Sequence, residues 1–245
     1  MYHPFSVAET IKTAWDIFKK NFITISVYSI IAFLLSFIMG IIISILLPSS
    51  EFYPKLFASF VLVLIQAFTT LGLYKLIFTL IDSEYYEFEF KQVLPNIKMI
   101  FSYLCVIFII GFFIATYEIF ILRKLEKDSL SYQIADYIGA GIGLYTILRI
   151  MFFNSFIVDD KSGPIESLRQ SIALTKNYIS KVVLILSIII SMIVLLILLY
   201  LSYQAIAVIL FFVFVYPFVN IVLIAMYRKL IYSHQDVDDI VAEAL

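Results

Sequence analysis

Residues 182–227 read VVLILSIIISMIVLLILLYLSYQAIAVILFFVFVYPFVNIVLIAMY, a run of 46 residues without aspartate, glutamate, lysine or arginine. At about 1.5 Å per residue, one helix of this length would be about 69 Å long. That is more than twice the roughly 30 Å thickness of a bilayer's hydrocarbon core. The run therefore predicts two membrane spans, residues 182–203 and 204–227, joined by a hairpin turn near residues 202–204.

The rest of the chain has the same character. Of its 245 residues, 63% are hydrophobic and 14% are charged, whereas soluble domains have roughly 45–50% apolar and about 25% charged residues. Four more apolar runs are long enough to cross a bilayer: residues 22–47, 56–81, 99–122 and 134–158. These runs are apolar on every face, which argues against a β-barrel, and helices satisfy their own backbone groups in lipid. We therefore expect an all-α polytopic membrane protein with six transmembrane helices, in a single membrane domain over residues 1–245.

The distribution of lysine and arginine predicts the orientation. If the N-terminus is cytoplasmic, twelve of these residues lie on the cytoplasmic side. Four lie on the outer side, namely Lys55, Arg123, Lys124 and Lys127, and Arg149 falls inside a span. The positive-inside rule then places both termini in the cytoplasm.

Two segments that precede spans show helical periodicity. The apolar residues before the first span are Val7, Ile11, Ala14, Trp15, Phe18 and Phe22, and those before the fifth are Ile165, Leu168, Ile172, Thr175 and Ile179. Ser6 and Glu9 have the spacing of a capping box, and Gly163-Pro164 is typical of a helix start. Both segments predict amphipathic helices on the cytoplasmic surface of the membrane.

The two segments also align at one constant offset of 157 residues, which pairs Glu9 with Glu166, Lys12 with Arg169 and Lys19 with Lys176. A weaker match, interrupted by Pro95, precedes the third span at an offset of 86. This pattern predicts three tandem units of a surface helix and two spans, at residues 1–82, 83–160 and 161–230, followed by a cytoplasmic tail at 231–245. The alternative is that any helix next to a membrane looks amphipathic.

Ionisable residues inside spans are costly and are therefore candidate functional residues. Lys75 and Arg149 stand seven and ten residues before Asp82 and Asp159, so both side chains could extend to lipid phosphates. Arg149 lies deeper than Lys75 and is the stronger candidate. Glu118 is expected among head groups or paired with a neighbouring lysine or arginine.

Two further spans contain unusual residues. In the fourth span, Gly139 and Gly143 form a small-xxx-small step that predicts close helix packing, within the chain or between copies in a homo-oligomer. In the sixth span, Pro217 interrupts the backbone hydrogen bonds and Asn220 follows three residues later. A kinked helix with a polar notch is a candidate binding site, although a neighbouring helix can also satisfy the freed carbonyl.

Several classes of function lack the residues that they need. The sequence contains no H-E-x-x-H, G-x-S-x-G, Walker A or G-x-G-x-x-G motif. Its two histidines, His3 and His234, lie outside the spans, and Cys105 has no partner for a disulfide. We therefore expect no enzyme, no metal site and no cofactor. A net charge of −1 argues against nucleic acid as a partner.

A longer motif joins the fourth and fifth spans. It comprises Leu148-Arg149-Ile150-Met151-Phe152-Phe153, then residues 157–171 with Asp159-Asp160 and Gly163-Pro164, then Leu174-Thr175-Lys176. This motif resembles a signature of bacterial six-span proteins related to the membrane domain that is fused to some glycerophosphodiester phosphodiesterases. Tyr216-Pro217, residues 225–230 and the opening helix with Trp15 are also similar. The resemblance implies a bacterial inner-membrane protein with six spans and supplies no active site.

Two functions follow as hypotheses. The first is a non-enzymatic membrane protein or scaffold that organises or senses the bilayer, with membrane lipids as its partners. The second is a transporter or carrier of a small solute or lipid, with Arg149, Asn220 and the Pro217 kink near a cavity.

Overall fold

The computed structural model describes residues 6–47, 52–82, 90–127 and 129–243, and within these ranges it contains helices and no strands. Six of the helical segments are long and apolar enough to cross a membrane, so the predicted all-α polytopic fold is confirmed. The elements in chain order are α1 (Val7–Lys20), α2 (Phe22–Leu46), α3 (Phe52–Asp82), α4 (Phe90–Val93), α5 (Ile97–Phe120), η1 (Leu122–Lys124), α6 (Leu130–Ile150), α7 (Phe153–Val158), α8 (Pro164–Thr175), α9 (Ile179–Ser202), α10 (Gln204–Leu210), the π-helix η2 (Phe211–Val215) and α11 (Tyr216–Glu243).

The chain forms two compact units. The first comprises Met1–Asn96 and Ser180–Leu245, and the second comprises Ile97–Ile179. Helices α1 to α4 and α9 to α11 thus belong to the first unit, and α5 to α8 belong to the second.

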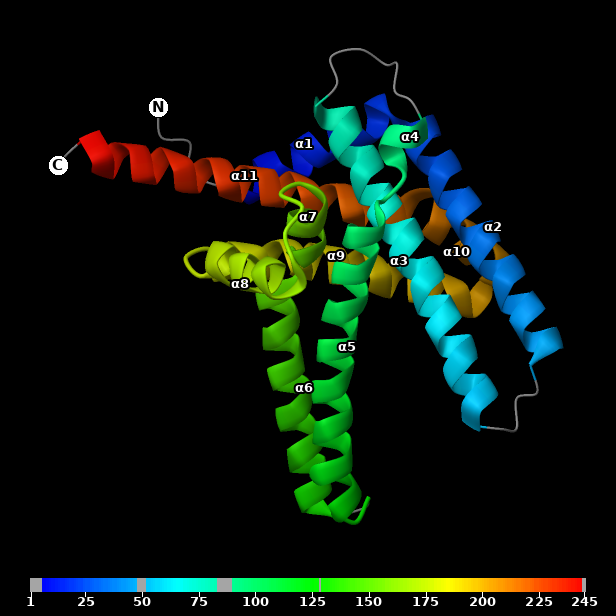
Figure 1. Ribbon diagram of the computed structural model, residues 1–245. Helices are drawn as coiled ribbons and strands as arrows, with labels where there is room; N and C mark the ends of the chain where they lie inside the picture. Colours follow the sequence, from blue (N-terminus) through cyan, green and yellow to red (C-terminus); the bar gives the residue numbers. More distant parts are fainter. Residues whose placement is uncertain (1–5, 48–51, 83–89, 128, 244–245) are drawn as a thin grey trace. The chain divides into compact units, whose positions relative to one another are not determined.

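In the first unit, α1 lies beside α11 (Figure 1). The contact buries Thr10, Ala14 and Phe18. The Phe18 ring packs edge-on against Phe214 at a centroid distance of 5.1 Å and also contacts the ring of Phe218. Lys229 of α11 forms an ion pair with Glu9 at 2.9 Å. Much of the apolar face that was predicted to lie on the membrane is therefore covered by α11, and Trp15 stays 41% exposed.

Helices α2 and α3 pack as a hairpin in the same unit. The Tyr28 hydroxyl of α2 donates to the Thr69 carbonyl of α3 at 3.0 Å. It lies over Gly72, where an added Cβ atom would overlap the Tyr28 oxygen. The absence of a side chain at position 72 is what allows the two helices to approach this closely.

The predicted turn between the last two spans is confirmed. Helix α9 ends at Ser202, and α10 begins at Gln204. Tyr203, with φ −139° and ψ 68°, is the one residue between them.

In the second unit, α5 and α6 run antiparallel (Figure 1). Helix α8 contacts α5, α6 and α7, so it covers the ends of the two long helices.

The fourth candidate span, Leu130–Val158, contains the predicted residues 134–158 but is interrupted. Within it, α6 ends at Ile150 and a separate short helix, α7, begins at Phe153. The chain has no glycine or proline at this break, and tertiary hydrogen bonds described below hold it open.

Two predictions about helix starts have different outcomes. Gly163 is the N-cap of α8 and Pro164 is its first residue, as predicted. Ser6 is the N-cap of α1, but its side chain makes no capping hydrogen bond. The expected capping box is therefore wrong, and the Thr10 hydroxyl instead donates to the Ser6 carbonyl at 2.7 Å.

The helix boundaries repeat at the offset found in the sequence. Helices α1 and α8 begin at Val7 and Pro164, and α2 and α9 begin at Phe22 and Ile179; both pairs are 157 residues apart. The same offset relates the buried residues Thr10, Ala14 and Phe18 to Ser167, Ser171 and Thr175. The segment before the third span forms only the one-turn helix α4 among the described residues. The division into three tandem units stays a prediction.

Candidate functional site

The break between α6 and α7 is held by a side chain from α8. The Ser171 hydroxyl donates to the Arg149 carbonyl at 2.9 Å and accepts from the Phe152 N–H at 3.1 Å. One hydroxyl thus satisfies two of the backbone groups that a helix end leaves without intrahelical partners. Phe152 is fully buried, so both hydrogen bonds lie in an apolar setting.

Helix α8 packs with its hydroxyl side inward. It buries Ser167, Ser171, Leu174 and Thr175. By contrast, Ile165 is 72% exposed and Ile172 is 42% exposed. A helix in water would show the opposite arrangement. The sequence placed Thr175 on the same apolar face as Ile165 and Ile172, but the structure places it on the buried side.

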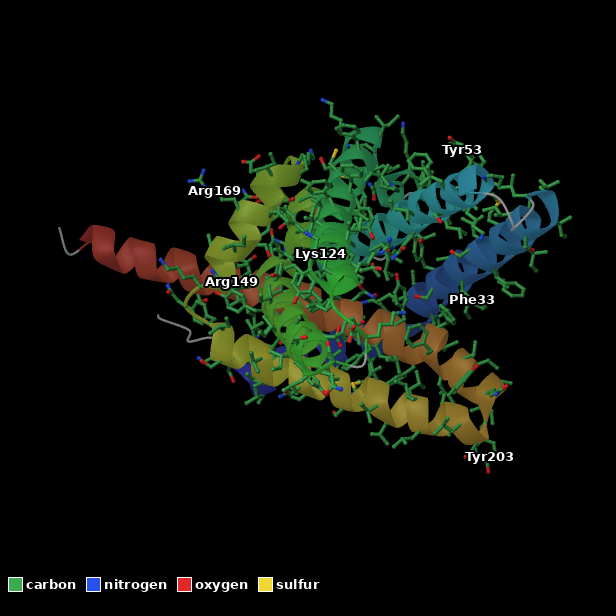
Figure 2. The ribbon with its side chains drawn as sticks, turned by 90° about the horizontal axis from the view of Figure 1, so that it is seen from below. Phe33, Tyr53, Lys124, Arg149, Arg169 and Tyr203 are labelled. Atoms are coloured by element: carbon green, nitrogen blue, oxygen red, sulfur yellow. The ribbon has the colours of Figure 1, made fainter. Side chains whose placement is uncertain are left out.

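The outer side of α8 also carries positive charge. Arg169 and the C-cap residue Lys176 are exposed. At about 100° per residue, both lie next to the two isoleucines and opposite Ser171. Figure 2 shows the Arg169 side chain extended away from the ribbon. One face therefore combines apolar and cationic side chains.

The loop that leads into α8 is fixed by two hydrogen bonds of Ser162. Its hydroxyl donates to Gln170 Oε1 at 2.7 Å, and its N–H donates to the Phe156 carbonyl at 3.2 Å. Lys161, just before it, has a φ of 57°. This left-handed conformation is unfavourable for residues other than glycine, asparagine and aspartate.

Arg149 lies near the end of α6 and within the candidate span Leu130–Val158. It is in the last turn of α6, where a positive charge interacts favourably with the helix dipole. The side chain is half-buried, and no ion pair joins it to another described residue. Helix α6 stops at Ile150, one residue after Arg149, and the candidate span continues to Val158.

A second group of polar residues lies in the first unit, where η2 meets α11. Pro217 has no N–H for the Val213 carbonyl four residues earlier. That carbonyl accepts instead from the Ser26 hydroxyl of α2 at 3.0 Å. Asn220, which is buried, donates from Nδ2 to the Tyr216 carbonyl at 2.8 Å. The Tyr216 hydroxyl lies close to the Thr70 hydroxyl of α3. The structure thus brings Pro217 and Asn220 together with polar groups of α2 and α3.

The other two predicted ionisable residues have protein partners. Lys75 Nζ donates to the Leu94 carbonyl at 2.7 Å, so its charge is directed to the chain that follows α4. Glu118 lies 3.5 Å from Arg123, and both side chains are more than half exposed. Exposed pairs of this kind contribute little to stability.

The two predicted packing glycines differ. A Cβ atom on Gly139 would lie 2.5 Å from the ring of Tyr117 in α5, and the Tyr117 hydroxyl donates to the Ala135 carbonyl. Gly139 therefore packs within the second unit. Gly143 has no heavy atom within 4 Å of such a Cβ.

The acidic residues Asp82, Glu84, Glu87 and Glu89 follow one another at the end of the second span. Asp82 pairs with Arg228 at 2.7 Å, and the Arg228 guanidinium also lies over the Phe78 ring. Glu84, Glu87 and Glu89 lie outside the described residues, as do the side chains of His234, Asp236, Asp238 and Asp239.

Sequence reasoning missed three residues that organise these sites: Ser171, Ser26 and Gly72. A signal existed for Ser171, because Ser167, Ser171 and Thr175 recur every four residues and so share one helix face. Ser26 and Gly72 gave no comparable signal, since their partners are distant in sequence. No protein-family model, curated protein or solved structure matches the chain.

Proposed function

We propose that this chain is a non-enzymatic integral protein of a bacterial inner (cytoplasmic) membrane, with both termini in the cytoplasm, that organises or senses the lipid bilayer. Helix α8 is the element through which it does so. The observation that carries the proposal is the polarity of α8, which buries Ser167, Ser171 and Thr175 and exposes Ile165 and Ile172.

The physical argument rests on the cost of exposing these isoleucines. Complete removal of a large apolar side chain from water contributes roughly 1.5–3 kcal/mol of stabilisation. An isoleucine that stays exposed to water does not gain this free energy. Acyl chains at the level of the head groups supply an apolar environment, and Arg169 and Lys176 can reach the phosphates beside them. Helix α8 then packs against its own unit through Ser167, Ser171 and Thr175, and it contacts the leaflet through Ile165 and Ile172.

The experiment is hydrogen exchange of the full chain in nanodiscs whose lipids differ in packing density. We expect the exchange rates of residues 164–175 to rise when the lipids pack loosely, because the isoleucines lose contacts. A double variant, Ile165→Ser with Ile172→Ser, should lose this response. The matched control is Ala173→Ser, an exposed position on the same helix away from the two isoleucines. Equal exchange in all lipids would contradict the proposal.

A specific observation favours the second candidate, a transporter or carrier of a small solute or lipid. A π-helix, Pro217 and buried Asn220 occur together with hydroxyl groups from two other helices. Short π segments and interrupted helices are frequent at binding sites in membrane proteins. This candidate would use the polar group at the start of α11 rather than α8.

Solvent access separates the two candidates. In a Cys105→Ser background, cysteines introduced at positions 149 and 220 are treated with a water-soluble thiol reagent from each side of a sealed vesicle. Labelling of position 220 from either side would support a transport pathway. Resistance of both positions would remove the basis of that candidate.

A further inference from the structure

Helices α1 and α8 present the same arrangement of side chains outward. In α1 it consists of Lys12, Trp15 and Lys19, and in α8 of Arg169, Ile172 and Lys176. In each helix the middle residue is a large apolar side chain about two-fifths exposed, 41% for Trp15 and 42% for Ile172. The four cations are all exposed.

The opposite side of each helix is fixed to its own unit. Helix α1 buries Thr10, Ala14 and Phe18 against α11, and α8 buries the three residues at equivalent positions against α5, α6 and α7. The outward arrangement in each unit is therefore set by packing, not by the free rotation of a mobile segment.

Around each helix, the apolar residue, the cations and the acid follow one another in the order in which a leaflet presents acyl chains, phosphates and water. At about 100° per residue, the two cations lie about 40° and 60° beyond the apolar residue, and an acid lies about 120° beyond it. That acid is Glu9 in α1 and Glu166 in α8. In α1, Asp16 lies between the cations and Glu9. An apolar side chain can thus enter the acyl region while the cations meet phosphates, and the acids lie farther round each helix, where Glu9 pairs with Lys229 of α11.

We propose that these two surfaces, Lys12/Trp15/Lys19 and Arg169/Ile172/Lys176, bind the head groups of anionic phospholipids. The proposal rests on the proposed function of α8 and adds both the chemistry of the lipid and a second, equivalent surface on α1. Four spans separate the two helices in the chain, so both surfaces lie on the same side of the membrane. Each cation near an anionic leaflet contributes on the order of a five-fold preference.

The first arm of the test uses Trp15, the only tryptophan in the chain. The full-length protein is reconstituted in vesicles that contain equal fractions of phosphatidylglycerol and phosphatidylcholine, with bromine on the acyl chains of one or the other lipid. We expect brominated phosphatidylglycerol to quench Trp15 fluorescence more strongly, and 0.5 M salt to reduce the difference because it screens exposed charges.

Variants identify the residues responsible. In the double variant K12Q/K19Q, the two brominated lipids should quench Trp15 fluorescence equally. The variant K12R/K19R, which keeps the charges, should retain the preference. The matched control K91Q/K98Q removes two exposed lysines elsewhere on the same side and should also retain it. A preference that persists in K12Q/K19Q would overturn the assignment for α1.

The second arm moves the reporter to α8. In a W15F/I172W chain, brominated phosphatidylglycerol should again quench preferentially, and R169Q/K176Q should abolish the difference. Equal quenching by both lipids in the unsubstituted background would overturn the proposal but leave the contact of α8 with the bilayer intact. No quenching of the tryptophan at position 172 by either lipid would contradict the proposed function itself.

Discussion

The Ser26 hydroxyl of α2 donates a hydrogen bond to the Val213 carbonyl of η2 at 3.0 Å. This carbonyl is the one that the N–H of residue 217 would reach in a regular α-helix, and residue 217 is a proline. A side chain from another helix therefore takes the place of the missing backbone donor. The arrangement makes the irregular start of α11 depend on its contact with α2.

Replacement of Ser26 by alanine should therefore lower the free energy of unfolding by about 0.5–1.5 kcal/mol, because the Val213 carbonyl loses its donor in an apolar setting. Ser26→Thr keeps a hydroxyl and should cost less. The effect of Ser26→Ala should shrink in a Pro217→Ala background, where an N–H is restored. Reversible unfolding in SDS measures Ser26→Thr and the four chains of the cycle: the unsubstituted protein, Ser26→Ala, Pro217→Ala and the double variant. Additive effects of Ser26→Ala and Pro217→Ala would contradict the coupling.

Substitution of Gly72 by alanine should separate α2 from α3. The new methyl group would overlap the Tyr28 hydroxyl, and overpacking of this kind costs about 1–3 kcal/mol. Tyr28→Phe removes the oxygen and should recover much of that loss in the double variant. Gly40→Ala is the matched control, since nothing lies within 4 Å of that site. Equal melting temperatures for the Gly72 and Gly40 variants would refute the close approach.

Removal of the Ser171 hydroxyl should loosen the junction of α6 and α7. The Phe152 N–H and the Arg149 carbonyl would each lose a hydrogen bond, at a cost of about 1–3 kcal/mol. We expect faster hydrogen exchange at the Phe152 amide in Ser171→Ala. The control is Ser187→Ala, because that hydroxyl is exposed and bonds only to the Val183 carbonyl of its own helix among the contacts described. Unchanged exchange at Phe152 would show that Ser171 does not hold the break.

Lys161 offers a stabilising substitution. Its φ of 57° is unfavourable for lysine but not for glycine. Lys161→Gly should raise the free energy of unfolding by about 0.5–1 kcal/mol. This net value already includes the opposing cost of the larger conformational entropy that glycine has in the unfolded chain. Lys161→Ala removes the same charge without relieving the backbone and should give no gain. Thermal unfolding in detergent distinguishes the two, and a gain from alanine would assign the effect to the charge.

The sequence was sufficient for the architecture because its signals are local. The charge-free run at residues 182–227 was too long for one span, and the structure turns at Tyr203, inside the predicted window. The start of α8 at Gly163-Pro164 was also local, since proline at the first helical turn needs no tertiary partner.

The break after Ile150 could not be predicted in this way. Residues 148–153 contain no helix-breaking residue, and the groups that stabilise the break come from Ser171, about twenty positions later. The close contact between Tyr28 and Gly72 also could not be predicted, because the two residues are far apart in the sequence. Such features depend on pairs of residues that the fold brings together, and a single sequence does not show which pairs these are.

The candidate sites were predicted in part. Pro217 and Asn220 do lie among polar groups, but the residues that surround them, Ser26 and Thr70, were not anticipated. For α8, the four-residue spacing of Ser167, Ser171 and Thr175 was visible in the sequence, but Thr175 was placed on the apolar face and the two serines were not singled out. Only their packing against α5, α6 and α7 shows that the isoleucines are the outer face.

The single residue between α9 and α10 has a consequence for how these two segments are arranged. Tyr203 alone is too short a connection to let the ends of α9 and α10 move apart. The ends of the two segments therefore stay next to each other at this side of the membrane, and the Ser26–Val213 hydrogen bond joins the second segment to α2.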